Sequence, residues 1–227
     1  MRILAIDTAL EACAASVFDA GHRRMLASES LAMARGHAEA LMPLIARVMD
    51  KADTEFSALD RIAVTVGPGS FTGLRVGISA ARGIALVSGK PAVGLSTLSV
   101  YAAPHIANAE RAAIVAAIDA KHGRVYLQVF ASTGRTLVAP TVATLREAVD
   151  AALPGPVCLV GSGAALVAAA WPAEEAAPLI VDAQDAPAID WVARLGAAAP
   201  QTDVAPTPLY LRPPDARPQD AARLARR

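Results

Sequence analysis

The stretch from residue 67 to residue 77 has the residue types that could bind a phosphate group. It begins Gly67-Pro68-Gly69-Ser70 and follows residues 62–66, whose alternating side chains predict a strand. The glycines and the proline end that strand, and Ser70 or Thr72 can cap a helix directly after it. The free N–H groups at the start of such a helix bind anions well, so phosphate binding is the first chemistry to consider.

The spacing within this stretch differs from both common phosphate-binding patterns. A Walker loop needs a lysine directly after its last glycine, whereas Leu74 follows Gly73 here. A dinucleotide-binding loop needs Gly-x-Gly-x-x-Gly, and the third glycine comes one residue late. Pro68 also lacks the N–H group that a phosphate would use. We therefore favour a role in packing or in a protein contact, and anion binding remains the alternative.

Other side chains that could do chemistry are few. The four histidines and two cysteines lack the spacing of a zinc site. Cys13 and Cys158 lie in apolar segments, which predicts reduced core residues. Ser70 with His37 could form a peptidase pair, but no Gly-x-Ser-x-Gly turn surrounds Ser70 and no third member is evident. A peptidase is therefore the least favoured enzyme class.

The elements that would position these residues occur in the same order in both halves of the chain. In the first half we predict three strands in a meander, then helix, strand, helix, strand and helix, over residues 2–8, 13–18, 24–31, 37–51, 62–66, 70–86, 92–95 and 97–103. In the second half we predict three strands, then helix, strand and helix, over residues 112–118, 123–130, 135–142, 144–153, 157–160 and 164–170. The helix after Ser70 should carry Leu74, Ile78, Ala81, Ala85 and Leu86 on one side, and its small residues should let another backbone approach closely.

Matching residues accompany this matching order. Ala5-Ile6-Asp7 recurs as Ala117-Ile118-Asp119, and Val66-Gly67-Pro68-Gly69 recurs as Val160-Gly161-Ser162-Gly163. We interpret the chain as a duplicated β-β-β-α-β-α unit, an α/β fold with two lobes. The alternative is that two α/β lobes share short apolar runs by chance.

We place the boundary between the lobes at residues 104 and 105. The first lobe, 1–104, holds the meander, an apolar helix and the glycine-rich turn. The second lobe, 105–227, ends in a helix over 186–199 and a proline-rich tail that can pack back on the first lobe. Residues 220–227 are locally basic and predict a short helix or a frayed, solvated end.

The composition argues against a nucleic-acid-binding surface and against a membrane protein. The formal net charge is +0 and the hydrophobic fraction of 54% is raised by alanine. We expect neither a membrane span, because apolar runs are too short, nor a signal peptide, because the chain starts directly in a strand. The sequence thus predicts a cytoplasmic protein without direct nucleic-acid binding.

The helix predicted from His37 has more apolar positions than one contact with a sheet needs. Leu41, Met42, Ile45 and Met49 are among them, and they cover more than one face. Such a stripe predicts an interface with another protein, and methionines suit a surface that accepts more than one partner. The alternative is that all these residues face the internal sheet.

Five segments of the sequence resemble the TsaB (YeaZ) family. They are residues 3–8, 36–43, 67–77, 118–126 and 208–212, and together they span nearly the whole chain. The resemblance implies two actin- and hexokinase-like (ribonuclease H-like) lobes, in agreement with the duplication. It also implies a role in making threonylcarbamoyladenosine, the modified base beside the anticodon of tRNAs that read codons starting with A.

The resemblance further implies a non-catalytic subunit without a cofactor. In the family, TsaB binds its paralogue TsaD, which holds the metal and transfers the threonylcarbamoyl group, and the ATPase TsaE joins them. The isolated subunit is expected to form a homodimer through the first lobe. The interface carried over by the resemblance consists of Leu41, Met42, Ile45 and Met49, with His37, Glu39 and Arg75 as the polar rim.

The alternative within the same superfamily is an ATPase or small-molecule kinase. Such enzymes place an acidic residue and a glycine-rich hairpin around the phosphates in each lobe, and Asp7 and Asp119 keep the acids. A vestigial nucleotide region would comprise Asp7, Thr8, Gly67, Gly69, Ser70 and Asp119. Glu11 weakens this hypothesis because its charge would repel a phosphate. Each aspartate could instead accept N–H groups of its own turn.

Overall fold

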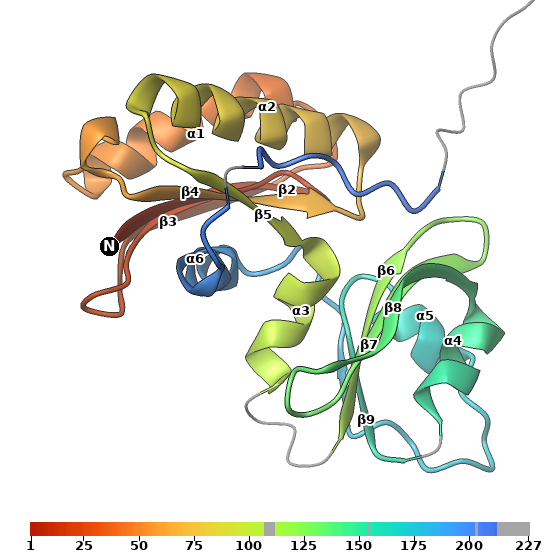
Figure 1. Cartoon of the computed structure of the whole chain (residues 1–227). Helices are drawn as coiled ribbons and strands as arrows, with labels where there is room; N and C mark the ends of the chain where they lie inside the picture. Colours follow the sequence, from red (N-terminus) through yellow and green to blue (C-terminus); the bar gives the residue numbers. More distant parts are fainter. Residues whose placement is uncertain (107–111, 154, 203, 213–227) are drawn as a thin grey trace, which may run out of the picture.

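The computed structural model describes residues 1–106, 112–153, 155–202 and 204–212. Its described residues form two lobes, each built on a five-stranded mixed sheet (Figure 1). The α/β class and the two lobes predicted from the sequence are confirmed. The short helix or frayed end predicted for residues 220–227 lies outside the described residues.

The first sheet has the strand order β3-β2-β1-β4-β5. Its strands are β1 (Arg2–Asp7), β2 (Ala12–Asp19), β3 (Arg24–Ala32), β4 (Arg61–Gly67) and β5 (Ala92–Ser96). The first three pair antiparallel as the predicted meander, and β4 and β5 continue the sheet in parallel with β1. Because parallel strands end at the same edge, Asp7 and the glycine-rich turn after β4 lie close together.

The second sheet repeats this topology in the order β8-β7-β6-β9-β10. Its strands are β6 (Ala113–Asp119), β7 (Arg124–Phe130), β8 (Thr136–Thr144), β9 (Val157–Val160) and β10 (Ile180–Asp182). Three strands are again antiparallel neighbours, and two more join in parallel to the first of them. The duplication inferred from matching residues is therefore present in the strand order.

Helices cover both faces of the first sheet. Figure 1 shows α1 (His37–Lys51) and α2 (Phe71–Ser88) side by side on one face and α6 (Ile189–Ala198) on the other. Leu4 and Ile6 pack beneath α1 and α2, whereas Ile3 and Ala5 pack against α6. This alternation is what a strand buried on both faces requires.

The second sheet is covered in the same way. Helices α4 (Leu145–Ala152) and α5 (Ala164–Ala169) pack with the core around Val115 and Ala117. Helix α3 (Thr97–Ile106) packs on the opposite face against Ile114, Ala116 and Ile118. A short 3-10 helix, η1 (Phe56–Ala58), precedes β4.

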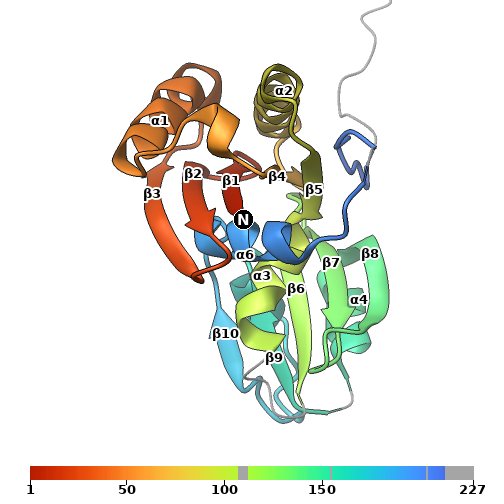
Figure 2. The ribbon, with the colours of Figure 1, turned by 60° about the vertical axis from the view of Figure 1, so that its left-hand side comes forward.

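Helices α3 and α6 each pack on the sheet of the other half. Helix α3 follows β5 in the chain but contacts β6, β7 and β9, and α6 follows β10 but contacts β1, β2 and β4. Figure 2 shows the two helices together where the lobes meet. The predicted boundary between the lobes, at residues 104 and 105, falls inside α3. The exact position of this boundary remains a prediction.

Local chemistry explains why the main helices begin and end where they do. The Ser70 hydroxyl accepts the N–H of Gly73 and caps α2, as one of the two predicted caps. Thr144 and Glu147 form a reciprocal capping box at α4. Gly89 ends α2 at φ 67°, a conformation that favours glycine. Within the described residues, none of the helices has the length and apolar character needed to span a bilayer.

Candidate functional site

A cleft of about 610 Å³ lies where the ends of β1 and β6 face each other. Its walls come from the β1–β2 turn, the glycine-rich turn, the β6–β7 turn and the last described segment. The lining residues are Leu10, Glu11, Ala34, Gly69, Ser70, Phe71, Ile118, Asp119, Ala120, Lys121, Tyr126, Ser162, Asp185, Tyr210 and Arg212. Of the six residues predicted for a vestigial nucleotide region, Gly69, Ser70 and Asp119 line this cleft.

Asp7 is enclosed below the cleft rather than exposed in it. One carboxylate oxygen accepts the Thr65 hydroxyl and the Ala9 N–H, while Oδ2 has no partner among the described residues. Burial raises the pKa of Asp7 to about 6, although the hydrogen bond from Thr65 opposes that shift. A carboxylate so enclosed cannot reach a ligand in the cleft without rearrangement of the turn above it.

Asp119, the counterpart of Asp7, is more open and is engaged by its own turn. Lys121 donates its backbone N–H to Asp119 Oδ1 at 2.7 Å, and its Nζ lies 2.9 Å from Oδ2. Burial raises the pKa of Asp119, but the bonds from Lys121 outweigh that effect and the net shift is downward. Both aspartates thus accept N–H groups of their own turns, the structural role left open by the sequence.

The glycine-rich turn is packed tightly against the end of β1. A Cβ atom on Gly69 would lie 2.3 Å from the Ala9 carbonyl oxygen, and one on Gly73 would lie 2.1 Å from that of Thr8. The Thr8 hydroxyl donates to the Gly73 carbonyl at 2.7 Å. These glycines let α2 approach the β1–β2 turn, which is the packing role that we favoured.

Two N–H groups of this turn, those of Ser70 and Gly73, are already used inside the protein. Ser70 donates its N–H to the Ala9 carbonyl at 2.7 Å, and Gly73 donates to the Ser70 hydroxyl at 3.2 Å. In the second lobe Gly163 donates to the Ala117 carbonyl at 3.0 Å. These three N–H groups are not presented to a phosphate, which weakens the anion-binding alternative.

The charges of the cleft also disfavour a phosphate. Its described lining holds three carboxylates, Glu11, Asp119 and Asp185, against two cations, Lys121 and Arg212. Lys121 is paired with Asp119, and Arg212 donates to the Ala120 carbonyl at 3.1 Å. The remaining carboxylates would repel a triphosphate in a partly enclosed site.

The last described segment joins the two sides of the cleft. Leu209 donates its N–H to the Val66 carbonyl at 2.7 Å, beside the glycine-rich turn. The Tyr210 ring stacks on Phe71 with 5.2 Å between centroids, and its hydroxyl accepts from Arg75 Nε at 3.0 Å. We call residues 208–212 the clasp, because Arg212 then reaches the β6–β7 turn of the other lobe.

This chain is similar to known proteins both in sequence and in structure. The family model described as TsaD, tRNA N6-adenosine threonylcarbamoyltransferase, matches residues 24–183. The TsaB protein of Escherichia coli K12 is 36% identical over 126 residues, which cover 56% of this chain and 53% of that protein. The solved structure of YeaZ from Pseudomonas aeruginosa superposes with a TM-score of 0.75 at 29% identity, covering 92% of this chain and 99% of that one.

An uncharacterised protein of Mycobacterium tuberculosis H37Rv extends the similarity along the chain. It is 34% identical over 221 residues, covering 95% of this chain and 94% of its own. The chain belongs to the TsaB (YeaZ) family. It nevertheless aligns with only about half the length of the curated TsaB relatives that it matches, 52% to 58%.

The TsaB resemblance assigned seven residues to a partner interface, and the structure corrects four of these assignments. Leu41, Ile45 and Met49 are at most 4% exposed and belong to the core beneath the first sheet's helices. His37 is also buried, with Nε2 lying 3.1 Å from the Leu10 carbonyl. The reason is that α1 is enclosed by α2 as well as by β2 and β3, so a wide apolar stripe is needed inside the protein.

Three of the seven residues are exposed. Met42 is half exposed, and Glu39 is exposed on the same helix. Arg75 is exposed too, but it lies 3.7 Å above the Phe71 ring and binds Tyr210, so it belongs to the clasp contacts. The seven residues therefore do not form one surface.

The structure shows an exposed apolar surface that was not part of the predicted partner interface. Leu86 and Val87 on α2 are 84% and 90% exposed. The expectation that Leu86 lies on the same side of α2 as Ala81 is wrong, because at 100° per residue the two positions are about 140° apart around the helix. The helical period was thus the signal that could have placed Leu86 outside.

The peptidase hypothesis finds no support in the geometry. Ser70 caps α2 while His37 contacts the Leu10 carbonyl, so the peptidase pair is engaged elsewhere. Within the described residues, no group of three or more acidic, histidine or cysteine side chains could hold a metal ion.

Proposed function

We propose that this chain is a non-catalytic subunit that binds a TsaD-like transferase and supports threonylcarbamoylation of tRNA. The adenosine beside the anticodon, in tRNAs that read codons starting with A, is the proposed target. Membership of the TsaB family supports the pathway, and the match to the TsaD family model supports a paralogous partner. The chain would act by binding the active conformation of the transferase more tightly than its inactive one.

The proposed binding of a partner is supported chiefly by the exposed outer side of α1 and α2. We call this surface the helix face, and it consists of Ala38, Met42, Ala46, Ser79, Gly83, Leu86 and Val87, all exposed. Large apolar side chains at Leu86 and Val87 are costly to leave in water, and the small residues elsewhere on this face allow a partner helix to approach closely. In the absence of the transferase, two copies of the chain would pair through the same face.

The helix face replaces the interface first predicted from the sequence. Met42 remains part of it, while the buried Leu41 and Ile45 support α1 from inside. A TsaE-like ATPase would join the pair of subunits rather than this chain alone. The cleft would remain a structural junction without a nucleotide, and the chain would act in the cytoplasm.

The test is association with the TsaD-like transferase of the same organism, measured by size-exclusion chromatography with light scattering. We expect the wild-type chain to co-elute with it and the double variant Met42→Glu, Val87→Glu to elute alone with an unchanged circular dichroism spectrum. The matched control is Leu137→Glu with Leu179→Glu, two exposed apolar positions of the second lobe, which should still co-elute. Equal association of the helix-face variant would contradict the proposed surface.

A further inference from the structure

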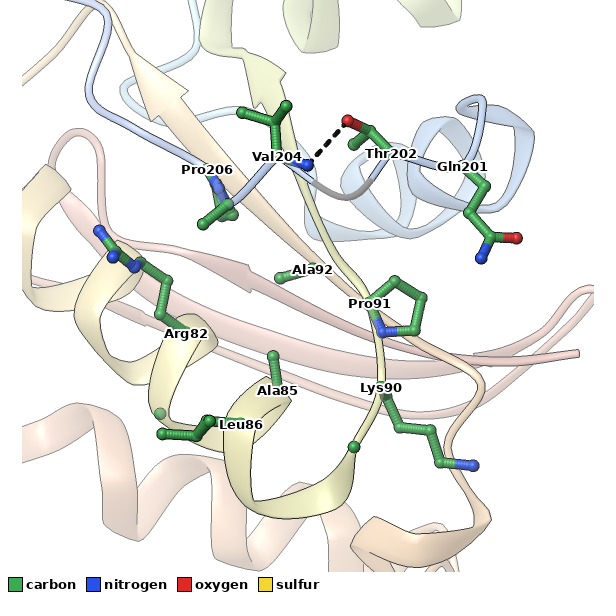
Figure 3. Close-up of a pocket in the computed structure, with 13 residues that line it drawn as sticks. Arg82, Ala85, Leu86, Lys90, Pro91, Ala92, Gln201, Thr202, Val204 and Pro206 are labelled. Carbon is green, nitrogen blue, oxygen red and sulfur yellow. Dashed lines mark hydrogen bonds between the residues drawn. The ribbon is translucent and has the colours of Figure 1, made fainter.

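A groove of about 670 Å³ runs between the C-terminal half of α2 and residues 201–202 and 204–206 (Figure 3). Its lining includes the apolar side chains of Ala85, Pro91, Ala92 and Pro206. Leu86 of the helix face is also among the lining residues. On the other side of the groove Val204 is 74% exposed, and its N–H donates to Thr202 Oγ1 at 3.1 Å. The groove is thus an open apolar channel next to the helix face.

Two cations stand at different points along this groove. Arg82 and Lys90 are the charged residues among its described lining, and neither forms an ion pair within the described part of the chain. Asp203, between Thr202 and Val204, lies outside the described residues. Six of the eight steps from Arg82 to Lys90 lie within α2 and cover about 9 Å along its axis, and Gly89 and Lys90 continue the chain beyond the helix end.

We propose that this groove binds an acidic, partly apolar segment of the transferase subunit, an inference that rests on the proposed function. An extended segment rises about 3.3 Å per residue, so carboxylates four residues apart would reach both Arg82 and Lys90. In an extended segment the side chain midway between the two carboxylates points to the same face as they do. An apolar side chain at that midway position would lie on Ala85 and Pro91. The partner's charge and its apolar residue would thus be recognised together.

A protein segment fits this groove better than RNA does. The described lining has no aromatic side chain on which a base could stack, and it offers two cations rather than a basic track. Its floor is apolar, which suits a side chain and not a phosphate.

The test compares the wild-type chain with the double variant Arg82→Glu, Lys90→Glu. The control is Arg24→Glu with Arg135→Glu, an equal change of charge at exposed positions outside the groove. Affinity for the TsaD-like transferase is measured by biolayer interferometry at low and at high salt, and each variant is checked for an unchanged urea unfolding midpoint. If the reversal fails to fold, Arg82→Ala with Lys90→Ala replaces it.

We expect the groove variant to bind the transferase at least about tenfold more weakly than wild type, and its affinity to fall less than that of wild type when salt is added. The control should bind like wild type. Equal binding of the groove variant would overturn the groove while leaving the proposed function intact. Failure of the wild-type chain to bind the transferase would overturn both. Binding of each protein to tRNA is measured in the same way, and a groove variant that loses it while binding the transferase normally would overturn the protein occupant in favour of RNA.

Discussion

At the scale of single residues, Asp7 is held in an environment that favours its neutral form. Its carboxylate is fully buried, and Oδ2 has no partner among the described residues. Burial raises its pKa from the ordinary value of 3.8 to about 6. The folded state therefore binds more protons than the unfolded state between these two values, and Asp7 makes the protein less stable as the pH rises through them.

Replacing Asp7 with asparagine should remove this pH dependence. From the raised pKa we expect the free energy of unfolding of the wild type, relative to Asp7→Asn, to fall by about 2 kcal/mol between about pH 4.5 and pH 7. Urea unfolding at several pH values measures the difference. Parallel pH profiles for the two proteins would contradict this description of Asp7.

Asp119→Asn is the matched control because the pKa of Asp119 is shifted in the opposite direction to that of Asp7. The pKa of Asp119 is lowered in the folded state, so its contribution to stability is present at neutral pH and is lost as the pH falls. The variant should therefore be less stable than wild type at pH 7 and approach it in acid. If the difference in free energy of unfolding from wild type changed with pH in the same way for both variants, burial would not distinguish the two aspartates.

Gly77 offers a second test at this scale. A Cβ atom there would lie 2.4 Å from the Thr8 hydroxyl oxygen, whereas a Cβ on Gly83 of the same helix would meet nothing within 4 Å. We expect Gly77→Ala to lower the free energy of unfolding by about 1–3 kcal/mol and Gly83→Ala to raise it by about 1 kcal/mol. Urea midpoints that move together would contradict the close approach of α2 to the β1–β2 turn.

At the scale of elements, the clasp holds the end of the described chain against α2. Tyr210→Ala would remove both the stacking on Phe71 and the hydrogen bond from Arg75, while Tyr210→Phe removes only the latter. We expect the Leu209 amide, which donates to Val66, to exchange its hydrogen much faster in Tyr210→Ala and only slightly faster in Tyr210→Phe. Unchanged protection in Tyr210→Ala would show that the clasp is held by other contacts.

Most elements could be predicted from the sequence because their periodicity is strong. The meander, α1 and the Ser70 cap of α2 were predicted, since alternation, helical spacing and cap chemistry are local properties. Strand β10 was missed because Ile180–Asp182 is only three residues long. The burial of Leu41 and Met49 depends on α2 lying beside α1, and no local pattern reports that contact.

At the scale of the whole molecule, α3 and α6 tie the lobes together by each packing on the other half's sheet. The sequence predicted the duplication but not this exchange, because repeated residues reveal repeated elements and not which sheet a terminal helix covers. The same limit applies to the cleft. Asp7 and Asp119 occupy matching positions, yet only the packed structure shows that Asp7 is enclosed and Asp119 is paired with Lys121.

The cleft between the lobes should not bind ATP with useful affinity. Glu11 and Asp185, which form no ion pair within the described residues, line this cleft, and the N–H groups of Ser70 and Gly73 are already engaged. Isothermal titration of magnesium-ATP into the isolated chain should therefore give no saturable heat. Micromolar binding would favour the ATPase or kinase alternative over a non-catalytic subunit.

The central claim is that this chain activates a transferase rather than doing the chemistry itself. The most direct measurement is threonylcarbamoylation of tRNA by the reconstituted TsaD-like and TsaE-like proteins, with and without this chain. We predict modification only when the wild-type chain is added, and loss of that modification with Met42→Glu, Val87→Glu. Full modification in the absence of this chain would contradict the claim.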